Sequence, residues 1–174
     1  LEDSDGDIWM TTSNGICYYN TRTKQWKDML TSQQQDKHEQ NYVFISLCEP
    51  TPGTILVGGY MSGMYRINKK DMIPQYFTPQ AKGSKHIRPD KYIRSIYRDE
   101  EGNVWAGGYY NFKRINLASG EVEHYSTEYP ITYITSKNKE ELWVGTINGL
   151  YKFNKRSKQF LEVSDSVNMG TVNT

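Results

Sequence analysis

The sequence predicts an all-β chain built from about four β-propeller blades, each a four-stranded antiparallel sheet. Three observations predict this class. A strand–turn–strand segment recurs along the chain, a hairpin signal lies inside most copies of it, and helical periodicity is absent throughout.

The recurring segment is an apolar strand, a turn and a second strand that ends in Asn. Its copies start at Ile8, Ile55, Val104 and Leu142. The intervals between them are about 40 to 50 residues, and periods of this size with several short strands per unit are typical of propeller blades. The repeat therefore predicts a fold made of similar, successive sheets.

Four strands, lettered A to D in chain order, are expected in each unit. In the fourth unit they are 131–135, 140–146, 150–154 and 159–163. Each is short and rich in apolar, aromatic or β-branched residues, which suit a pleated surface.

Turn residues separate these strands. Asn-Gly between strands B and C predicts a two-residue type I′ hairpin at Asn14-Gly15 and Asn148-Gly149, and the second unit has Ser62-Gly63 there. The third unit has Asn111-Phe112, so its turn is expected to differ. Glycines also mark the A–B connections, at Gly6, Gly53 and Gly102.

The repeats divide the chain into consecutive blades. The expected ranges are 1–41 for blade 1 with its link, lacking most of its first strand, 42–91 for blade 2 with its link, 92–130 for blade 3, 131–163 for blade 4, and 164–174 for a tail or the start of a next blade. We expect a fragment of a larger propeller. The alternative is a closed four-bladed ring in which the tail supplies the missing strand of the first unit.

Composition excludes several classes of partner. Lys and Arg number 21 against 20 Asp and Glu, so the formal net charge is +1 and no single-sign field favours nucleic acid. No apolar stretch is long enough to cross a bilayer and no signal peptide opens the chain, so we expect targeting and membrane segments elsewhere in a longer protein. Cys17 and Cys48 are expected to be buried thiols, with a disulfide as the alternative.

Two segments carry a resemblance to a known family. Asp99–Asn116 and Glu140–Asn154 combine a turn glycine, an apolar-Trp-apolar-Gly strand and a second strand that ends in Asn. This pattern resembles the two-component regulator propeller repeat. The first unit departs from it at Met10-Thr11, where the family prefers apolar-Gly, and the second has Leu56 in place of Trp.

The resemblance implies a function for the segment. Such repeats build periplasmic sensor regions of bacterial hybrid two-component histidine kinases, often linked to sensing polysaccharide breakdown products. The implied role is a ligand-sensing extracytoplasmic segment, without enzymatic activity or cofactor of its own. The implied partners are an oligosaccharide or other small ligand, further propeller blades, a membrane-spanning kinase in the full chain, and a second copy in a homodimer.

Alternating strand directions sort the connections onto two faces. The B–C turns and the blade-to-blade D–A connections lie on one side, here called the B–C face. The A–B and C–D turns lie on the other, here called the A–B face. The two longest connections, 27–41 and 78–91, are D–A connections, and long loops in a compact domain are usually functional or disordered. We therefore interpret the B–C face as the recognition face.

Aromatic and amide side chains on this face suit sugar binding, because they offer apolar ring faces and directional hydrogen bonds. The candidate ligand-binding residues are Tyr60, Tyr109, Tyr110, Asn14, Asn111 and Asn148. The alternative for each tyrosine is packing against a neighbouring blade. The repeated strand B tryptophans, Trp9, Trp105 and Trp143, are expected in the core.

Two other functions stay open: a protein-interaction platform and a carbohydrate-active enzyme, which would need two convergent carboxylates. The carboxylates expected in the recognition-face loops are Asp28, Asp36, Glu39, Asp90 and Glu128. We expect no catalytic residue and no metal site. The segment Asp3-Ser4-Asp5-Gly6-Asp7 lacks the ligand spacing of a calcium loop, and His38, His86 and His124 lie far apart in the sequence.

Overall fold

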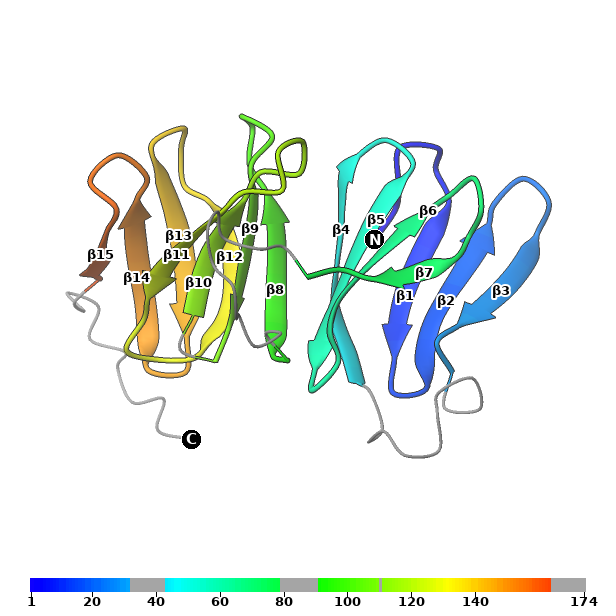
Figure 1. Cartoon of the computed structure of the whole chain (residues 1–174), viewed down its shortest axis with the longest axis horizontal. Helices are drawn as coiled ribbons and strands as arrows, with labels where there is room; N and C mark the ends of the chain where they lie inside the picture. The colour runs from blue at the N-terminus through cyan, green and yellow to red at the C-terminus, as the bar shows by residue number, and fades with distance from the viewer. Residues whose placement is uncertain (32–42, 79–90, 110, 164–174) are drawn as a thin grey trace, which may run out of the picture.

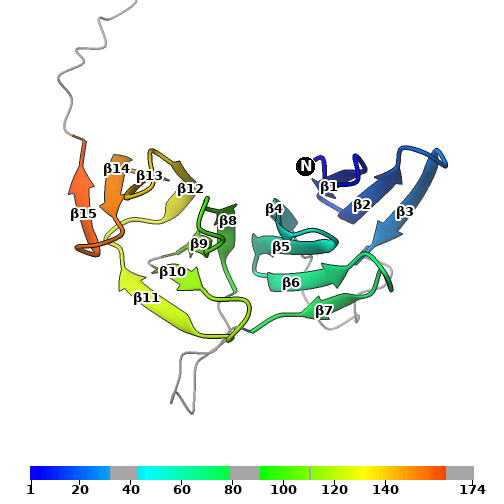
Figure 2. The same ribbon diagram turned by 90° about the horizontal axis from the view of Figure 1, so that it is seen from above.

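The computed structural model describes residues 1–31, 43–78, 91–109 and 111–163, and these contain strands and no helix. The strands form four antiparallel sheets, and within each sheet the strands lie in chain order. Figure 1 shows the sheets side by side, and Figure 2 shows that they follow one another along an open arc. The predicted class of β-propeller blades is confirmed.

The first two sheets comprise strands β1 to β7. Blade 1 has three strands, namely β1 (Ile8–Thr12), β2 (Gly15–Asn20) and β3 (Gln25–Met29). Blade 2 has four strands, namely β4 (Val43–Thr51), β5 (Thr54–Tyr60), β6 (Gly63–Asn68) and β7 (Pro74–Tyr76).

The last two sheets each have four strands. Blade 3 consists of β8 (Ile93–Arg98), β9 (Val104–Gly108), β10 (Asn111–Ile115) and β11 (Val122–Ser126). Blade 4 consists of β12 (Ile131–Ser136), β13 (Glu141–Thr146), β14 (Gly149–Asn154) and β15 (Gln159–Glu162).

The first D–A connection starts later than its predicted position at Lys27. Lys27 pairs with Tyr18, and Asp28 pairs with Cys17, in the ladder between β2 and β3. Asp28 is therefore a strand residue and not part of a recognition loop. The sequence prediction was wrong here because the end of this outer strand is polar, so its residues do not differ in hydrophobicity from those of the loop that follows.

The B–C hairpins occur where the Asn-Gly pairs predicted them, but their turn type differs. Thr12 pairs with Gly15, so Ser13 and Asn14 are the central residues, and neither has a positive φ. A type I′ turn needs a positive φ at both central positions. The positive φ falls instead on the glycine that starts the next strand, with values of 130° at Gly15 and 137° at Gly149.

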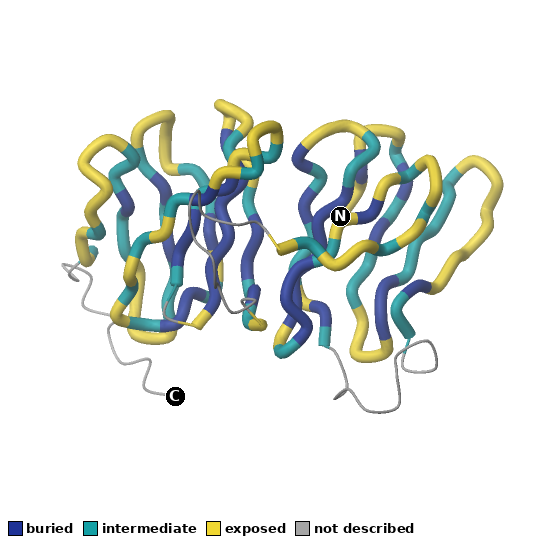
Figure 3. Tube along the Cα trace, in the orientation of Figure 1, coloured by how far each residue is buried: buried dark blue, intermediate teal, exposed yellow. Residues whose placement is uncertain are grey.

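The apolar cores lie between consecutive blades. Trp9 of blade 1 shares a buried cluster with Phe44 and Ile55 of blade 2, and Trp105 of blade 3 shares another with Phe153 of blade 4. The cluster between blades 2 and 3 has Leu56 at the position of the tryptophan. Figure 3 shows the buried segments within the strands and the exposed segments at the turns on both faces. Each sheet is therefore stabilised by its neighbours.

Trp143 corrects the expectation that every repeated tryptophan is core. Trp9 and Trp105 are buried, whereas Trp143 is half-buried, and Lys137 lies over its ring at 5.4 Å from the centroid. The strand B aromatic faces the following blade. In the described part of the chain no sheet packs on that side of blade 4, so Trp143 retains contact with solvent.

The two cysteines are free thiols, Cys17 half-buried and Cys48 buried. Burial raises the pKa of each to about 11, so both thiols are protonated at neutral pH. Among the described residues, no helix has the length and apolarity that a membrane crossing requires.

Candidate functional site

Three tyrosine rings form a continuous row on the B–C face, across blades 2 and 3. Tyr60 ends β5, Tyr92 immediately precedes β8, and Tyr109 follows β9. The Tyr60 and Tyr92 ring centroids lie 5.0 Å apart, and those of Tyr92 and Tyr109 lie 5.1 Å apart. We call this set the tyrosine row.

Backbone contacts hold the central ring in place. Ile93 pairs with Gly108, and a side chain at Gly108 would overlap the carbonyl oxygen of Tyr92. The backbone N–H of Gly63 in blade 2 donates a 3.0 Å hydrogen bond to the Lys91 carbonyl. The segment that enters blade 3 is thus fixed both to its own sheet and to the B–C turn of blade 2.

The two outer rings are accessible. Tyr60 is 42 % exposed and Tyr109 is 39 % exposed, although each packs on Tyr92. The rings are tilted or edge-to-face, as aromatic pairs prefer. The row therefore presents apolar ring surface and phenol hydroxyls together, which is the combination that suits a sugar ring.

The structure brings together only part of the predicted ligand-binding set. Tyr60 and Tyr109 meet through Tyr92, which sequence reasoning missed. The signal for Tyr92 was its place at the expected start of blade 3, next to a long D–A connection. Tyr110 lies outside the described residues.

The predicted amides do not gather at the tyrosine row. Asn14 and Asn148 are exposed in the B–C turns of blades 1 and 4, whereas the row lies in blades 2 and 3. Asn111 starts β10 in blade 3, and its Oδ1 is buried without a hydrogen-bond partner among the described residues. The role of each amide in binding stays a prediction.

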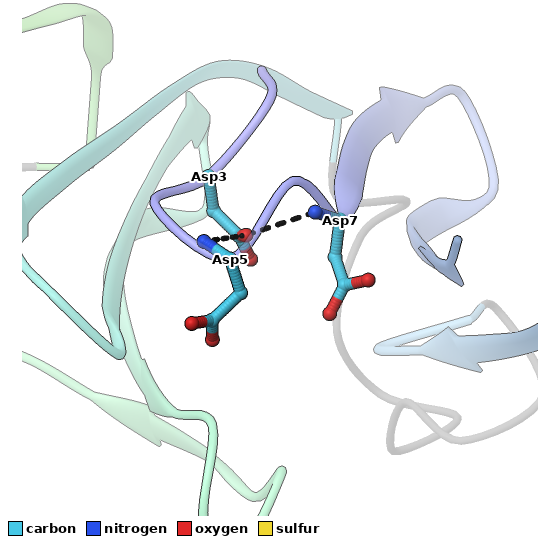
Figure 4. A group of neighbouring side chains, drawn as sticks. All are labelled: Asp3, Asp5 and Asp7. Carbon is cyan, nitrogen blue, oxygen red and sulfur yellow. Dashed lines mark hydrogen bonds between the residues drawn. The ribbon is translucent and has the colours of Figure 1, made fainter. Parts of the chain in front are cut away.

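Three carboxylates gather on the A–B face. Figure 4 shows Asp3, Asp5 and Asp7 in the A–B turn of blade 1, where Asp3 Oδ1 accepts hydrogen bonds from the backbone N–H groups of Asp5 and Asp7. Carboxylate oxygens of the three residues lie within 4.8 Å of one another. Such a group could bind a cation, and the cation that the structure provides is the Lys69 ammonium from blade 2.

The Lys69 ammonium forms an ion pair with each of the three carboxylates. It lies 2.7 Å from Asp3, 2.7 Å from Asp5 and 3.2 Å from Asp7. Burial disfavours the charged form of Lys69, but the three carboxylates outweigh burial and raise its pKa. Burial also opposes ionisation of Asp7, yet hydrogen bonds from Tyr18 and Thr21, together with Lys69, lower its pKa to about 2. The cluster is thus an ion pair between blades.

The same arrangement recurs between blades 3 and 4. Asp99 accepts a 2.8 Å hydrogen bond from the Trp105 indole and lies 2.8 Å from the Lys155 ammonium. In blade 1, Asp3 accepts a 2.7 Å hydrogen bond from Trp9. We call this unit of aspartate, indole and lysine from the next blade the Asp–Trp–Lys latch.

The carboxylates considered for catalysis do not form a common site in the described part of the chain. Asp28 lies in β3, and Asp36, Glu39 and Asp90 lie outside the described residues. Glu128 lines a separate cavity between blades 3 and 4. Of the histidines, His124 lies in β11, and His38 and His86 are outside the described residues.

Comparison with known families gives one match. Residues 88–110 match the family described as "Two component regulator propeller". The matched segment includes Tyr92, strands β8 and β9, and the Asp99 and Trp105 members of the second latch. No curated protein matches the chain.

Solved structures share the fold. The extracellular domain of a protein described as the hybrid two component system BT3049 from B. thetaiotaomicron has a TM-score of 0.76 and 14% identity, over 97% of this chain and 24% of that one. The extracellular domain described as that of the one component system BT4673, from the same organism, has a TM-score of 0.53 and 18% identity. The match covers 93% of this chain and 28% of that one.

A yeast protein also has a similar fold. Sqt1 from Saccharomyces cerevisiae has a TM-score of 0.66 and 18% identity, over 89% of this chain and 44% of that one. This chain spans about a quarter of the length of the two B. thetaiotaomicron domains. The chain therefore has the β-propeller fold, and its residues 88–110 match the family described as two component regulator propeller.

Proposed function

We propose that this chain is a ligand-sensing segment of an extracytoplasmic propeller in a hybrid two-component sensor histidine kinase. Its ligand would be a carbohydrate breakdown product, bound on the tyrosine row. The proposal rests on one observation above all: two exposed phenol rings from neighbouring blades both pack on the half-buried Tyr92 ring at the B–C face.

The match at residues 88–110 and the likeness to extracellular domains of two component systems support this role. In the proposal, the segment lies in the periplasm and belongs to a longer chain with further blades and a membrane-spanning kinase. A homodimer of such chains is the proposed signalling unit. The phosphoryl-transfer chemistry takes place outside this segment, which itself binds and does not catalyse.

The position of the row gives sensing a physical route. Tyr60 belongs to blade 2, and Tyr92 and Tyr109 belong to blade 3, so one ligand on the row contacts two blades. A ligand shifts a conformational equilibrium only if it binds the two states with different affinity. If the two states differ in the tilt between blades 2 and 3, a ligand that bridges these blades binds the two states with different affinity.

Calorimetric titration tests this function. We expect at least one of the neutral tetrasaccharides maltotetraose, xylotetraose and cellotetraose to bind the wild-type chain. Tyr60→Ala and Tyr109→Ala should each weaken binding by about 10-fold or more, because each removes an aromatic surface from the sugar.

Trp26→Ala is the matched control. Trp26 is 61 % exposed on β3 of blade 1, so this substitution removes an exposed aromatic ring that lies outside the tyrosine row. Its affinity should equal that of the wild type. Unchanged affinity in both tyrosine variants, or no binding of any of the three sugars, would contradict the proposal.

A further inference from the structure

The cavity that Glu128 lines lies on the B–C face, between blades 3 and 4. Its volume is about 300 Å³, at the lower end of the range for small-molecule sites. The D–A connection that contains Glu128 and Tyr129 forms one wall, and Tyr151, Phe160 and Glu162 from β14 and β15 form the other.

Backbone contacts define the shape of the cavity. The N–H of Ile147 in the B–C turn of blade 4 donates a 3.1 Å hydrogen bond to the Pro130 carbonyl, which joins that turn to the D–A connection. Tyr151 pairs with Glu162 across β14 and β15. Phe160 packs on Phe153, with ring centroids 4.8 Å apart. The walls therefore belong to the folded sheets and their shortest connections.

The charge of the lining is one-sided. Glu128 and Glu162 both line the cavity, and among the described lining residues none is Lys, Arg or His. The Glu128 carboxylate raises the pKa of Tyr129, and burial, Tyr151 and Glu162 act in the same direction. Both carboxylates therefore raise the pKa of the Tyr129 phenol, and the charged groups among the described lining residues are both negative.

Aromatic rings and hydroxyls complete the lining. The Tyr129 and Tyr151 ring centroids lie 6.4 Å apart at an angle of 35°, which leaves two ring surfaces beside the carboxylates. Thr127 lines the cavity, and its Oγ1 is buried without a hydrogen-bond partner among the described residues. Ser126 and Thr146 also line the cavity and add two more hydroxyl groups to it.

We propose that this cavity binds an amino sugar in its protonated form. The ammonium group would lie between the Glu128 and Glu162 carboxylates and against the Tyr129 and Tyr151 rings, whose faces attract cations. The sugar hydroxyls would face the Ser126 and Thr146 side chains, which also line the cavity. This site goes beyond the proposed function, because it takes a charged ligand on a different pair of blades from the tyrosine row.

Calorimetric titration with glucosamine, glucose and N-acetylglucosamine tests the assignment. Glucosamine should bind at least about 10-fold more tightly than the two neutral sugars, since a charge-assisted hydrogen bond contributes that much. Glu128→Gln and Glu162→Gln should each weaken glucosamine binding by about 10-fold, and added salt should weaken it further.

Glu140→Gln is the matched control, because Glu140 is an exposed carboxylate of blade 4 at the opposite, A–B face. It should leave glucosamine affinity unchanged. Thermal unfolding of each variant checks that the exposed substitutions leave the fold intact. Equal affinity for all three sugars, no binding of glucosamine, or no effect of both glutamate variants would overturn the proposal.

The two sites give separate readouts. Tyr60→Ala and Tyr109→Ala should leave glucosamine binding unchanged, and Glu128→Gln should leave tetrasaccharide binding unchanged. If glucosamine fails to bind while a tetrasaccharide binds, the cavity proposal has failed. If no tetrasaccharide binds while glucosamine does, the tyrosine-row proposal has failed.

Discussion

Asp3 and Asp99 are buried carboxylates that stay ionised because every partner they need is supplied locally or by the next blade. Each accepts backbone N–H groups two and four residues ahead, the indole N–H six residues ahead, and the ammonium of Lys69 or Lys155. Breaking such a set leaves a buried charge without compensation, which is more costly than losing an exposed ion pair.

Asp99→Ala should therefore destabilise the chain by about 3–5 kcal/mol. It leaves the Lys155 ammonium, 11% exposed, and the Trp105 indole without their acceptor. Urea unfolding followed by tryptophan fluorescence measures the loss.

Lys158→Met provides the comparison. Lys158 pairs with Glu123 at 2.9 Å, but its side chain is 56% exposed, so the change should cost about 1 kcal/mol or less. If the two variants lost equal stability, Asp99 would have no special role between the blades.

Acid should weaken the latches in a defined pH window. The folded-state pKa of Asp7 is lowered from 3.8 to about 2, and those of Asp3 and Asp99 are lowered as well. A lowered carboxyl pKa contributes stability that is fully present above the unfolded-state value and is lost as the pH falls through the folded-state value. The unfolding free energy should thus fall between pH of about 4 and about 2.

Urea unfolding at a series of pH values checks this dependence. Asp99→Asn removes one of the shifted carboxyls, so its stability should decline less steeply with falling pH than that of the wild type. Parallel curves for the two proteins would show that Asp99 ionises alike in the folded and unfolded states.

Among the elements, β9 is the strand that controls the tyrosine row. Gly108 ends β9, and the absence of a side chain there lets the Tyr92 carbonyl approach the strand closely. Gly145 in β13 is less crowded, because the nearest atom to an added Cβ is the side-chain oxygen Thr132 Oγ1 at 3.3 Å, a tight contact that a small shift of that side chain would relieve.

Gly108→Ala should displace the start of blade 3 and separate the Tyr60, Tyr92 and Tyr109 rings. We expect a loss of about 1–3 kcal/mol in stability, as for other overpacked positions, together with a loss of tetrasaccharide affinity. Gly145→Ala should keep both properties close to wild type. Intact sugar affinity in Gly108→Ala would show that the packing of Tyr92 does not position the row.

At the scale of the whole molecule, the blades form a linear series of interfaces that alternate in chemistry. The interfaces between blades 1 and 2 and between blades 3 and 4 each carry a latch and a buried tryptophan. The interface between blades 2 and 3 has an apolar core with Leu56 in the tryptophan position, and the tyrosine row lies at its B–C edge. Both proposed ligand sites lie at such interfaces on the B–C face, where a bound molecule contacts two sheets at once.

Repetition explains how much of this could be predicted from the sequence. The recurring strand pair and its turn glycines depend on local chemistry, so the blades, their strands and the two faces followed from them. Burial of a repeated residue depends on what packs beside it, so Trp143 differs from Trp105 despite the same motif. Tyr92 and the Glu128–Glu162 pair come from segments far apart in the chain, and no local spacing signals their meeting.

The location of ligand binding is the central claim, and two-dimensional NMR of the isotope-labelled chain tests it most directly. On titration with the tetrasaccharide that binds in calorimetry, the largest backbone shifts should fall at Tyr60, Tyr92, Tyr109 and their neighbours on the B–C face. Shifts confined to the A–B face around Lys69 and Lys155, or spread evenly over the blades, would contradict a recognition site on the tyrosine row.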